Sequence, residues 1–518
     1  ELSGGTDDAA RLFRQSTNLA RSIERLRMRF SALGKLEQSA SVSMQANDLA
    51  AEIEELERSQ QLTQVRLAEY PQYRAVADRF LGLDELRANM QPGEAYMRMA
   101  IVSGDIFIFY TDQTEATTYR VPLDEDMLDR KVDTIRDSIS VFENGQYVTY
   151  AFDIEAARAL YSSLFGPVSD RLAATQHLIF EPDGAMLRLP INLLVADDAS
   201  VERYLARTQE LDSDFFDFTG VKWLGRDLDI STAVSARAFT DARQAPQSTA
   251  SMQYLGLGRN EPILANTRIA GIRGAVQGVN DRCQWPLNQW NSPISDSELK
   301  EAQSQVGAGN SEIITGPAFT DTDILAKDNI SDFRILHFAT HGLVTAPSPS
   351  CPAKPALLTS FGESGSDGLL AFDEIFDLKL DADIVILSAC DTAGKASIAT
   401  TRAAGVSSGG GTALDGLVRS FIGAGGRSVL ASHWPAPDDF RATERLINGL
   451  FSDGRGRSIT GALRNSQLEL MNDPLTSHPY YWSGFALIGD GARSFLPDNK
   501  DATARTDAAS AATKAALK

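Results

Sequence analysis

The 518-residue sequence has few cysteines and no excess of positive charge. These two features argue against a disulfide-rich protein, a zinc protein and a nucleic-acid-binding protein. Three cysteines are too few for a disulfide framework, and five scattered histidines complete no zinc-binding spacing such as CxxC. The formal net charge of −20 argues against nucleic acid as a main partner, because phosphate binding needs a basic face. We therefore expect no cofactor, no metal and no nucleic-acid partner.

Long apolar runs and complete phosphate-binding loops are missing as well. No apolar stretch approaches the ~20 residues that cross a bilayer, so we predict no membrane span. The glycine-rich pieces GLGRNEP (256–262) and GAGGRS (423–428) complete neither of the common nucleotide-binding motifs. We expect such glycines to end helices instead.

What remains is an ordinary apolar content of 43% in a chain too long for one compact core. Changes in pattern along the chain divide it into four predicted parts. They are a helical hairpin or coiled-coil arm (1–75), an accessory α/β unit (76–240), a larger α/β domain (241–492) and a disordered tail (493–518).

The first two parts show different periods. Apolar residues between positions 7 and 67 recur every three, four or seven residues, which is typical of amphipathic helices. Residues 95–122 contain β-rich runs interrupted by SGD and TDQTE, a pattern typical of β-hairpins. Two helical stretches, 123–138 and 153–174, follow, and a further strand, a turn and an apolar run are predicted in 177–194.

The third part is the most regular. It contains six candidate strands, with helix-like segments between most of them: 251–258, 311–316, 333–340, 383–389, 427–434 and 484–490. Strands that alternate with helices predict a mostly parallel sheet with helices on both faces. Uniformly apolar strands fit burial on both sides. In such sheets, ligands bind at the carboxyl ends of the strands.

Two neighbouring apolar runs of this sheet end in reactive residues. RILHFATHG ends in His341 and Gly342, and ILSAC ends in Cys390. Both side chains are expected at the carboxyl edge of the sheet. The histidine precedes the cysteine by 390 − 341 = 49 residues, close to the caspase spacing of about 50. Singly, either residue is more often structural, but together their order and placement favour a catalytic dyad.

The chemistry of acyl transfer explains this combination. A thiol with an ordinary pKa of about 8.5 is mostly protonated at neutral pH, and the thiolate is the nucleophile. A nearby imidazole can take the thiol proton and later give it to the leaving amine. The backbone N–H groups of Gly342 and Cys390 are the candidate oxyanion donors.

Other polar residues near the predicted site have two readings each. His337 lies on the same strand as His341 but about 13 Å away, so we interpret it as a hydrogen-bonded residue behind the site. Asp391 and Asp415 either line an acidic pocket for Arg or Lys, or act as a turn cap and a first-turn helix acid. Trp434 either packs in the core or forms one wall of a substrate groove.

Four motifs together resemble the CHAT family of caspase-like domains: ILHFATHG, DADIVILSACDTAGK, LDGLVRSFIGAGGRSVLASHWPAPDD and HPYYWSGFALIGDG. The resemblance extends to LRANMQPGEAYMRM and LIFEPDGAMLRLPINLL, and so covers roughly residues 85–490. It implies a clan CD cysteine-peptidase fold with His341 and Cys390 as the dyad. By the same resemblance, residues 76–240 are a degenerate or accessory caspase-like unit. The helical arm is then expected to be the remnant of an upstream repeat region in a longer protein.

Two functions remain open from the sequence. The first is a cysteine endopeptidase that cleaves a protein or peptide substrate and is regulated by a protein partner through upstream helical repeats. The alternative is a catalytically silent caspase-like signalling or scaffold module. The compartment also stays open: it is cytoplasmic by default, or exported if Cys283 and Cys351 pair in a disulfide.

Overall fold

The computed structural model describes residues 81–496, except for several gaps, and six isolated positions nearer the N-terminus. The gaps are 144–145, 211–212, 264–284, 286, 344–355, 363–365, 389–410, 435 and 438. The predicted helical arm therefore lies outside the described residues, apart from those six positions. The predicted tail lies outside them as well, apart from residues 493–496.

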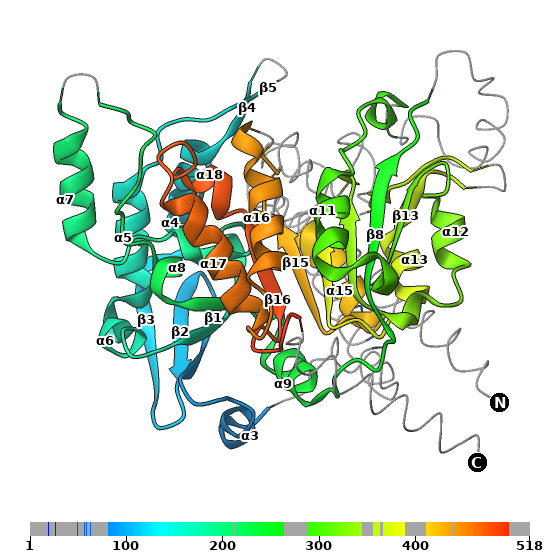
Figure 1. Ribbon diagram of the computed structural model, residues 1–518. Coiled ribbons are helices and arrows are strands. Elements are labelled where there is room, and N and C mark those ends of the chain that lie inside the picture. The colour runs from blue at the N-terminus through cyan, green and yellow to red at the C-terminus, as the bar shows by residue number, and fades with distance from the viewer. Residues whose placement is uncertain are drawn as a thin grey trace.

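One sheet of eleven strands runs through the described part of the chain, in the order β3-β2-β1-β6-β7-β16-β15-β14-β10-β8-β9 (Figure 1). The strands are β1 (Glu94–Val102), β2 (Asp105–Thr111), β3 (Ala116–Asp124), β6 (His177–Glu181), β7 (Asp229–Thr232), β8 (Met252–Asn260), β9 (Ser311–Gly316), β10 (Phe333–Ala339), β14 (Ile384–Leu387), β15 (Ser428–Ser432) and β16 (Phe485–Gly489). Two small sheets pair β4 (Val141–Glu143) with β5 (Gln146–Val148), and β11 (Gly342–Leu343) with β12 (Ala356–Leu358) and β13 (Leu369–Ala371).

The predicted mostly parallel α/β fold is confirmed. All six predicted strands are present and adjacent, as the block β16-β15-β14-β10-β8-β9. Within this block the pairings are parallel except between β15 and β16. The sheet also continues beyond it, because β7 pairs in parallel with β16. The pairing joins Ile488 to Thr232, so β16 is not the edge strand of the sheet.

Helices cover both faces of the sheet, as the alternation of side chains requires. Ile335, Ile384 and Leu430 belong to one core cluster, together with residues of α16 (Ala442–Ser452) and α17 (Ile459–Met471). Their chain neighbours, among them Leu336 and Val385, point to the other face and pack with α13 (Phe372–Asp377) and α15 (Gly411–Gly423).

Several of the remaining helices begin at a side chain that caps their first turn. Asp124 caps α4 (Glu125–Ile139) and Asp153 caps α5 (Ile154–Phe165) by accepting backbone N–H bonds of 2.7 and 2.8 Å. Gly425, at φ +113°, follows α15 in a backbone conformation that favours glycine, as predicted for the GAGG segment. The other α-helices are α3 (Leu83–Ala88), α4 (Glu125–Ile139), α5 (Ile154–Phe165), α6 (Ser169–Leu172), α7 (Asp198–Arg207), α8 (Leu224–Asp227), α9 (Ala236–Gln244), α11 (Ser297–Val306), α12 (Asp321–Leu325) and α18 (Pro479–Trp482).

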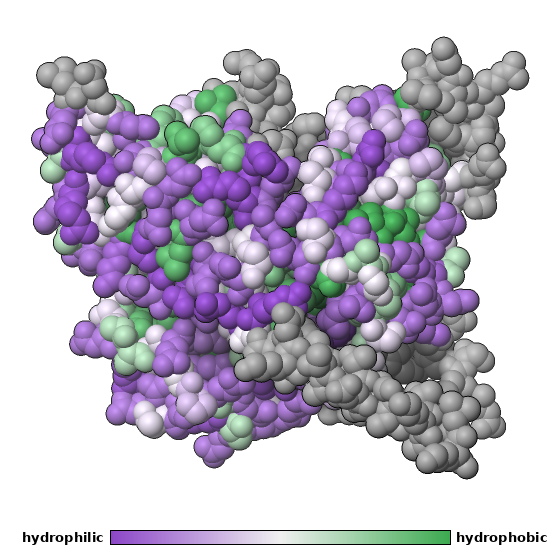
Figure 2. All heavy atoms as spheres, viewed as in Figure 1, coloured by the Kyte–Doolittle hydropathy of each residue, from purple (hydrophilic) through white to green (hydrophobic). Residues whose placement is uncertain are grey.

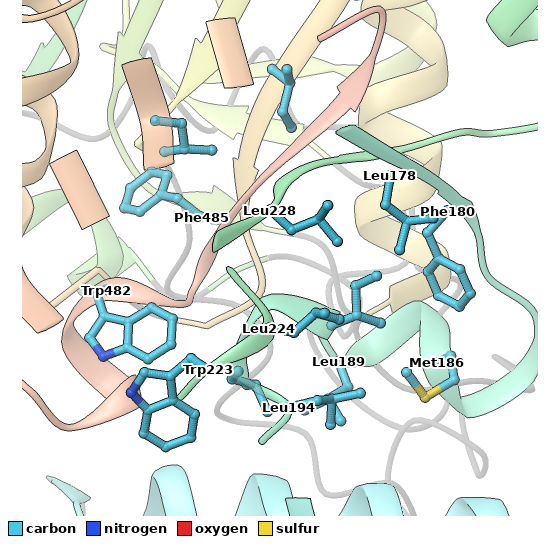
Figure 3. Packing of buried hydrophobic residues seen from close by; sticks show 14 of the residues in the cluster. Leu178, Phe180, Met186, Leu189, Leu194, Trp223, Leu224, Leu228, Trp482 and Phe485 are labelled. Carbon is cyan, nitrogen blue, oxygen red and sulfur yellow. The ribbon is translucent and has the colours of Figure 1, made fainter. Parts of the chain in front are cut away.

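The N-terminal strands and the six-strand block share one hydrophobic core. Figure 3 shows Trp223 beside Trp482, which comes from the other end of the chain. The ring centroids of Trp223 and Trp482 lie 5.4 Å apart, and both side chains are buried. The predicted boundary at residue 240 therefore separates two segments that one cluster of side chains joins.

The visible surface is mainly hydrophilic, with small separate groups of hydrophobic residues, one near α18 and another near β8 and β13 (Figure 2). This agrees with a net charge of −20. Within the described residues, no helix is both long and apolar enough to cross a membrane.

A buried polar network ties the first strands to the last one. The Glu94 carboxylate accepts hydrogen bonds from Arg243 (2.9 Å) and the Gln91 N–H (2.6 Å), and lies 3.0 Å from Nδ1 of His177. Arg243 also pairs with Asp490, directly after β16. Burial alone would raise the pKa of Glu94, but these hydrogen bonds outweigh it and lower the pKa from 4.5 to about 2.

This pKa predicts a specific loss of stability in acid. Because the folded pKa of Glu94 lies below its unfolded value, its contribution is complete above about pH 4.5 and is lost as the pH falls towards 2. Glu94→Gln should lower the free energy of unfolding by about 3 kcal/mol at pH 7, and the difference should shrink to about half by pH 3. Urea unfolding at the two pH values measures it.

The matched control for this prediction is Glu85→Gln, which removes an ion pair with Arg237 from a partly exposed carboxylate. An exposed pair of this kind contributes at most about 1 kcal/mol, so the control should stay close to wild type at both pH values. A Glu94→Gln difference that does not change with pH would contradict the assignment.

Candidate functional site

The candidate site begins where β10 ends. All seven residues of β10 are buried, and its parallel partner on the Cys390 side is β14. The register pairs Ile335 with Ile384 and Phe338 with Leu387, an offset of 49 residues. The Ser388 N–H then donates to the Phe338 carbonyl (2.9 Å), so the two strands stay paired up to the end of β14.

Two hydrogen bonds to β12, one from a side chain and one between backbones, fix the chain at Thr340 and His341. The Thr340 hydroxyl donates to the Leu358 carbonyl (2.5 Å), and the Leu358 N–H donates to the His341 carbonyl (2.8 Å). Thr340 is buried, whereas His341 is half-buried. The ring therefore projects from a rigid strand end.

The two ring nitrogens of His341 have different surroundings. Nε2 lies 2.6 Å from the backbone carbonyl of Ser292, and a carbonyl can only accept, so Nε2 carries the proton. Nδ1 is then the nitrogen with the free lone pair. It is buried and has no hydrogen-bond partner among the described residues. An imidazole held this way is ready to accept one proton at one defined atom.

The Ser292 carbonyl is held in place by its neighbour Trp290. The Trp290 ring is buried, its Nε1–H donates to the Thr359 carbonyl (2.9 Å), and its own carbonyl accepts from Asn260 (2.9 Å). The Phe361 ring packs against it at a tilt of 36°, with centroids 4.9 Å apart, and so helps to hold Trp290 in place. Sequence reasoning missed Ser292, because any residue type can supply a backbone carbonyl.

The other four histidines are committed elsewhere or are poor bases. His177 and His337 have partners at both ring nitrogens. Burial, together with the Arg136 charge, lowers the pKa of His433 to about 3. Burial also lowers the pKa of His478 to about 3, despite its hydrogen bond to Tyr150. Such groups bind a proton too weakly to serve as a base near neutral pH.

Gly342 opens β11 with its N–H directed away from the neighbouring strand. Gly342 lies opposite Leu357 in the antiparallel pair, and the Leu358 N–H bonds to the His341 carbonyl beside it. This places Gly342 in a non-hydrogen-bonded pair, whose own N–H points outwards. That donor lies one residue from the imidazole.

The structure describes only some of the remaining predicted site residues. Cys390 and Asp391 lie outside the described residues, and only the backbone of Asp415 is described, within α15. Trp434 is 4% exposed and donates its Nε1–H to the Tyr480 carbonyl (3.0 Å), which is a packing role. Its role in a substrate groove stays a prediction. Cys283 and Cys351 also lie outside the described residues, so their pairing stays open.

His337 occupies the place predicted for it, behind the site. Its side chain is fully buried, Nδ1 lies 3.0 Å from the Tyr254 hydroxyl, and Nε2 lies 3.2 Å from the Ser388 hydroxyl. His337 is therefore a hydrogen-bonded core residue, as expected. Its link to Ser388, which immediately follows β14, was not predicted.

The described geometry defines an α/β protein with a histidine, an orienting carbonyl and an outward backbone N–H at one edge of a parallel sheet. Comparison with known families identifies it further. The CHAT domain model matches residues 155–490, which is more than half of the chain. The chain therefore belongs to the CHAT domain family, as the sequence motifs suggested.

The individual relatives share less than 30% of their residues with this chain in the matched regions. Tetratricopeptide repeat protein 28 of Homo sapiens is 28% identical over 288 residues, 48% of this chain, and the Mus musculus protein is 27% identical over 143 residues, 27% of this chain. These matches span only 11% and 5% of the relatives' own length.

Solved structures also match, and the two described here have low sequence identity to this chain. The Saccharomyces cerevisiae separase–securin complex gives a TM-score of 0.39 at 10% identity, covering 91% of this chain and 37% of that one. The Arg-specific cysteine proteinase gingipain R gives a TM-score of 0.34 at 10% identity, covering 71% of this chain and 74% of that one.

Proposed function

We propose that this chain is a cysteine endopeptidase, in which Cys390 is the nucleophile and His341 the general base and acid. The observation that carries the proposal is the His341 ring itself. Its Nε2–H is held by the Ser292 carbonyl, and its buried Nδ1 has no partner among the described residues. A structural histidine would normally satisfy both nitrogens, because an unpaired buried polar atom costs stability.

The register of the sheet supports the pairing of His341 with Cys390. Phe338 and Leu387 lie opposite each other in the two strands. His341 comes three residues after Phe338, and Cys390 comes three residues after Leu387. The offset of 49 that relates β10 to β14 is thus the same number that separates the two candidates. Neighbouring strands lie about 4.8 Å apart, so paired strand ends deliver two side chains to one place.

The reaction then needs only groups on this chain. Nδ1 of His341 accepts the thiol proton of Cys390, and the thiolate attacks the scissile carbonyl. The N–H groups of Gly342 and Cys390 hold the oxyanion that develops. The imidazolium returns its proton to the leaving amine, and a water activated by the same nitrogen hydrolyses the acyl-enzyme.

Substrate selection is the finer part of the proposal. Asp391 and Asp415 supply an acidic pocket that favours Arg or Lys before the cut, with Trp434 forming one wall. Family membership and the tetratricopeptide repeat name of the relatives support control by an upstream helical repeat region that binds a protein partner. A library that shows no basic preference would remove Asp391 and Asp415 from the pocket.

A positional peptide library, combined with a thiol-reactive peptide probe, tests the function. We expect cleavage that is abolished in Cys390→Ala, and probe attachment at Cys390 but not at Cys283 or Cys351. The two other cysteines are built-in controls for general thiol reactivity. Absence of both cleavage and selective labelling would favour a catalytically silent scaffold module instead.

A larger side chain in the neighbouring strand β8 should also shift the His341 imidazole. A Cβ atom added at Gly258, near the end of β8, would lie 2.2 Å from the Ala339 carbonyl, so Gly258→Ala must displace the end of β10. We expect cleavage to fall about 100-fold, because a displacement near 1 Å has that effect on aligned groups. Steady-state kinetics on the best library peptide measures this.

Gly309→Ala is the matched control, since a Cβ atom added there meets nothing within 4 Å. It should keep the kinetics of the wild type. If both glycine variants cleave equally well, then the end of β10 does not position the reacting group.

A further inference from the structure

We propose that Ser388, held by His337, positions the nucleophile by fixing the end of β14 two residues before Cys390. This inference rests on the proposed function, because it concerns the placement of the attacking sulfur. It assigns to His337 and Ser388 a positioning role rather than contact with the substrate.

Ser388 is attached to β10 at two points. Its N–H donates to the Phe338 carbonyl (2.9 Å), and its hydroxyl lies 3.2 Å from Nε2 of His337. Ser388 is 2% exposed and His337 is fully buried, so water does not compete for these bonds. The strand end that leads to Cys390 is therefore fixed by both its backbone and its side chain.

His337 is itself held from the other side of the ring. Its Nδ1 lies 3.0 Å from the Tyr254 hydroxyl, which also lies 3.4 Å from the Leu299 carbonyl in α11. The Tyr254 and His337 rings meet at 71°, with centroids 6.0 Å apart. The imidazole thus joins β8, β10, α11 and the end of β14 at one point.

A buried acid makes this network unlike ordinary core packing. Glu298, in the first turn of α11, is 5% exposed, and its Oε1 lies 3.5 Å from Nε2 of His337. That oxygen has no hydrogen-bond partner among the described residues. A buried carboxylate oxygen without a hydrogen bond costs stability, so a core shaped only for stability would place an apolar residue here.

The location of Glu298 suggests what the acid does. Ser292, whose carbonyl orients His341, lies six residues before Glu298, in the segment that leads into α11. Glu298 and Ser388 both lie near the same nitrogen of His337, at 3.5 and 3.2 Å. The network links the segment that orients the base to the strand that carries the nucleophile.

Removal of one hydroxyl separates positioning from stability. We expect Ser388→Ala to lower kcat for the best library peptide by about 30- to 100-fold while KM stays within about twofold, because alignment rather than binding is lost. Ser388→Thr keeps the hydroxyl and should recover most of the rate. Alkylation of Cys390 by iodoacetamide should slow in Ser388→Ala as well.

Ser428→Ala is the matched control. Ser428 is equally buried at the start of β15, and its hydroxyl donates to the Asp383 carbonyl (2.7 Å), away from the site. It should change the melting temperature about as much as Ser388→Ala while leaving kcat within about twofold of wild type.

The outcomes are distinguishable. An active wild type, with a Ser388→Ala variant as fast as the Ser428→Ala control, overturns the positioning role alone. A wild type that cleaves no peptide overturns the proposed function, and this inference with it. Loss of kcat in Ser388→Ala, with recovery in Ser388→Thr, supports the positioning role.

Discussion

Replacement of His341 by alanine is expected to lower kcat/KM for peptide cleavage by about 10³- to 10⁴-fold. General acid–base catalysis contributes rate factors of this size, and the thiolate that remains would depend on the ordinary ionisation of Cys390. The fold should survive, because the ring is half-buried and its single described bond is to the Ser292 carbonyl. Removing the ring also removes an unpaired buried nitrogen.

The pH dependence distinguishes a lost base from a damaged fold. In wild type, Cys390 should be alkylated readily at neutral pH, because the imidazole takes the thiol proton. In His341→Ala, it should rise only as the pH approaches about 8.5, the ordinary thiol value. Labelling rates between pH 5 and 10, with a thermal melt of each variant, measure both properties.

His433→Asn is the matched control for this prediction. His433 directly follows β15, at the same edge of the sheet, and burial keeps its pKa near 3. It should retain kcat/KM within about fivefold of wild type. A His341→Ala variant as active as this control would mean that another group takes the thiol proton.

The strands of the central block could be predicted because each is a short apolar run that ends at a polar residue or glycine. The extension of the sheet could not. β7 reads DIST, a segment that neither alternates nor forms an apolar run, and only its pairing with β6 and β16 makes it a strand. Strand order across a sheet depends on crossovers that a local pattern does not contain.

Some residues of the candidate site could also be predicted from the sequence, and others could not. His341 and Gly342 could be found, because catalytic chemistry restricts their residue types. Ser292 could not, because it acts through a carbonyl that every residue has, placed by the buried ring of Trp290. The contact of His337 with Ser388 also depended on register, which sequence spacing predicts only when the pairing is known.

A buried ion pair at the start of β10 and β14 fixes the register of these two strands. Arg334 and Asp383 are separated by the same 49 residues, and both are about 95% buried. Nε and Nη2 of Arg334 donate to Oδ2 of Asp383 at 2.9 and 2.6 Å, and the Asp383 N–H donates to the Arg334 carbonyl at 2.8 Å. A slip of one residue would bury both charges without partners and turn every side chain to the wrong face.

Arg334→Met should therefore lower the free energy of unfolding by about 3 to 5 kcal/mol, because it leaves the Asp383 carboxylate buried without its main partner. The lower end is expected, since Arg427 lies 3.8 Å away and the Ser248 N–H donates to Asp383 at 3.2 Å. Urea unfolding, followed by circular dichroism, measures the change.

Two comparisons isolate the buried charge from the loss of one arginine. Arg334→Met combined with Asp383→Asn should recover at least half of the lost stability, because no unpaired carboxylate remains. Arg120→Met, which breaks the exposed pair with Asp105, should cost less than about 1 kcal/mol. Equal losses in the two single variants would show that the pair at the start of β10 and β14 does not fix their register, and the alignment of His341 with Cys390 would then need another cause.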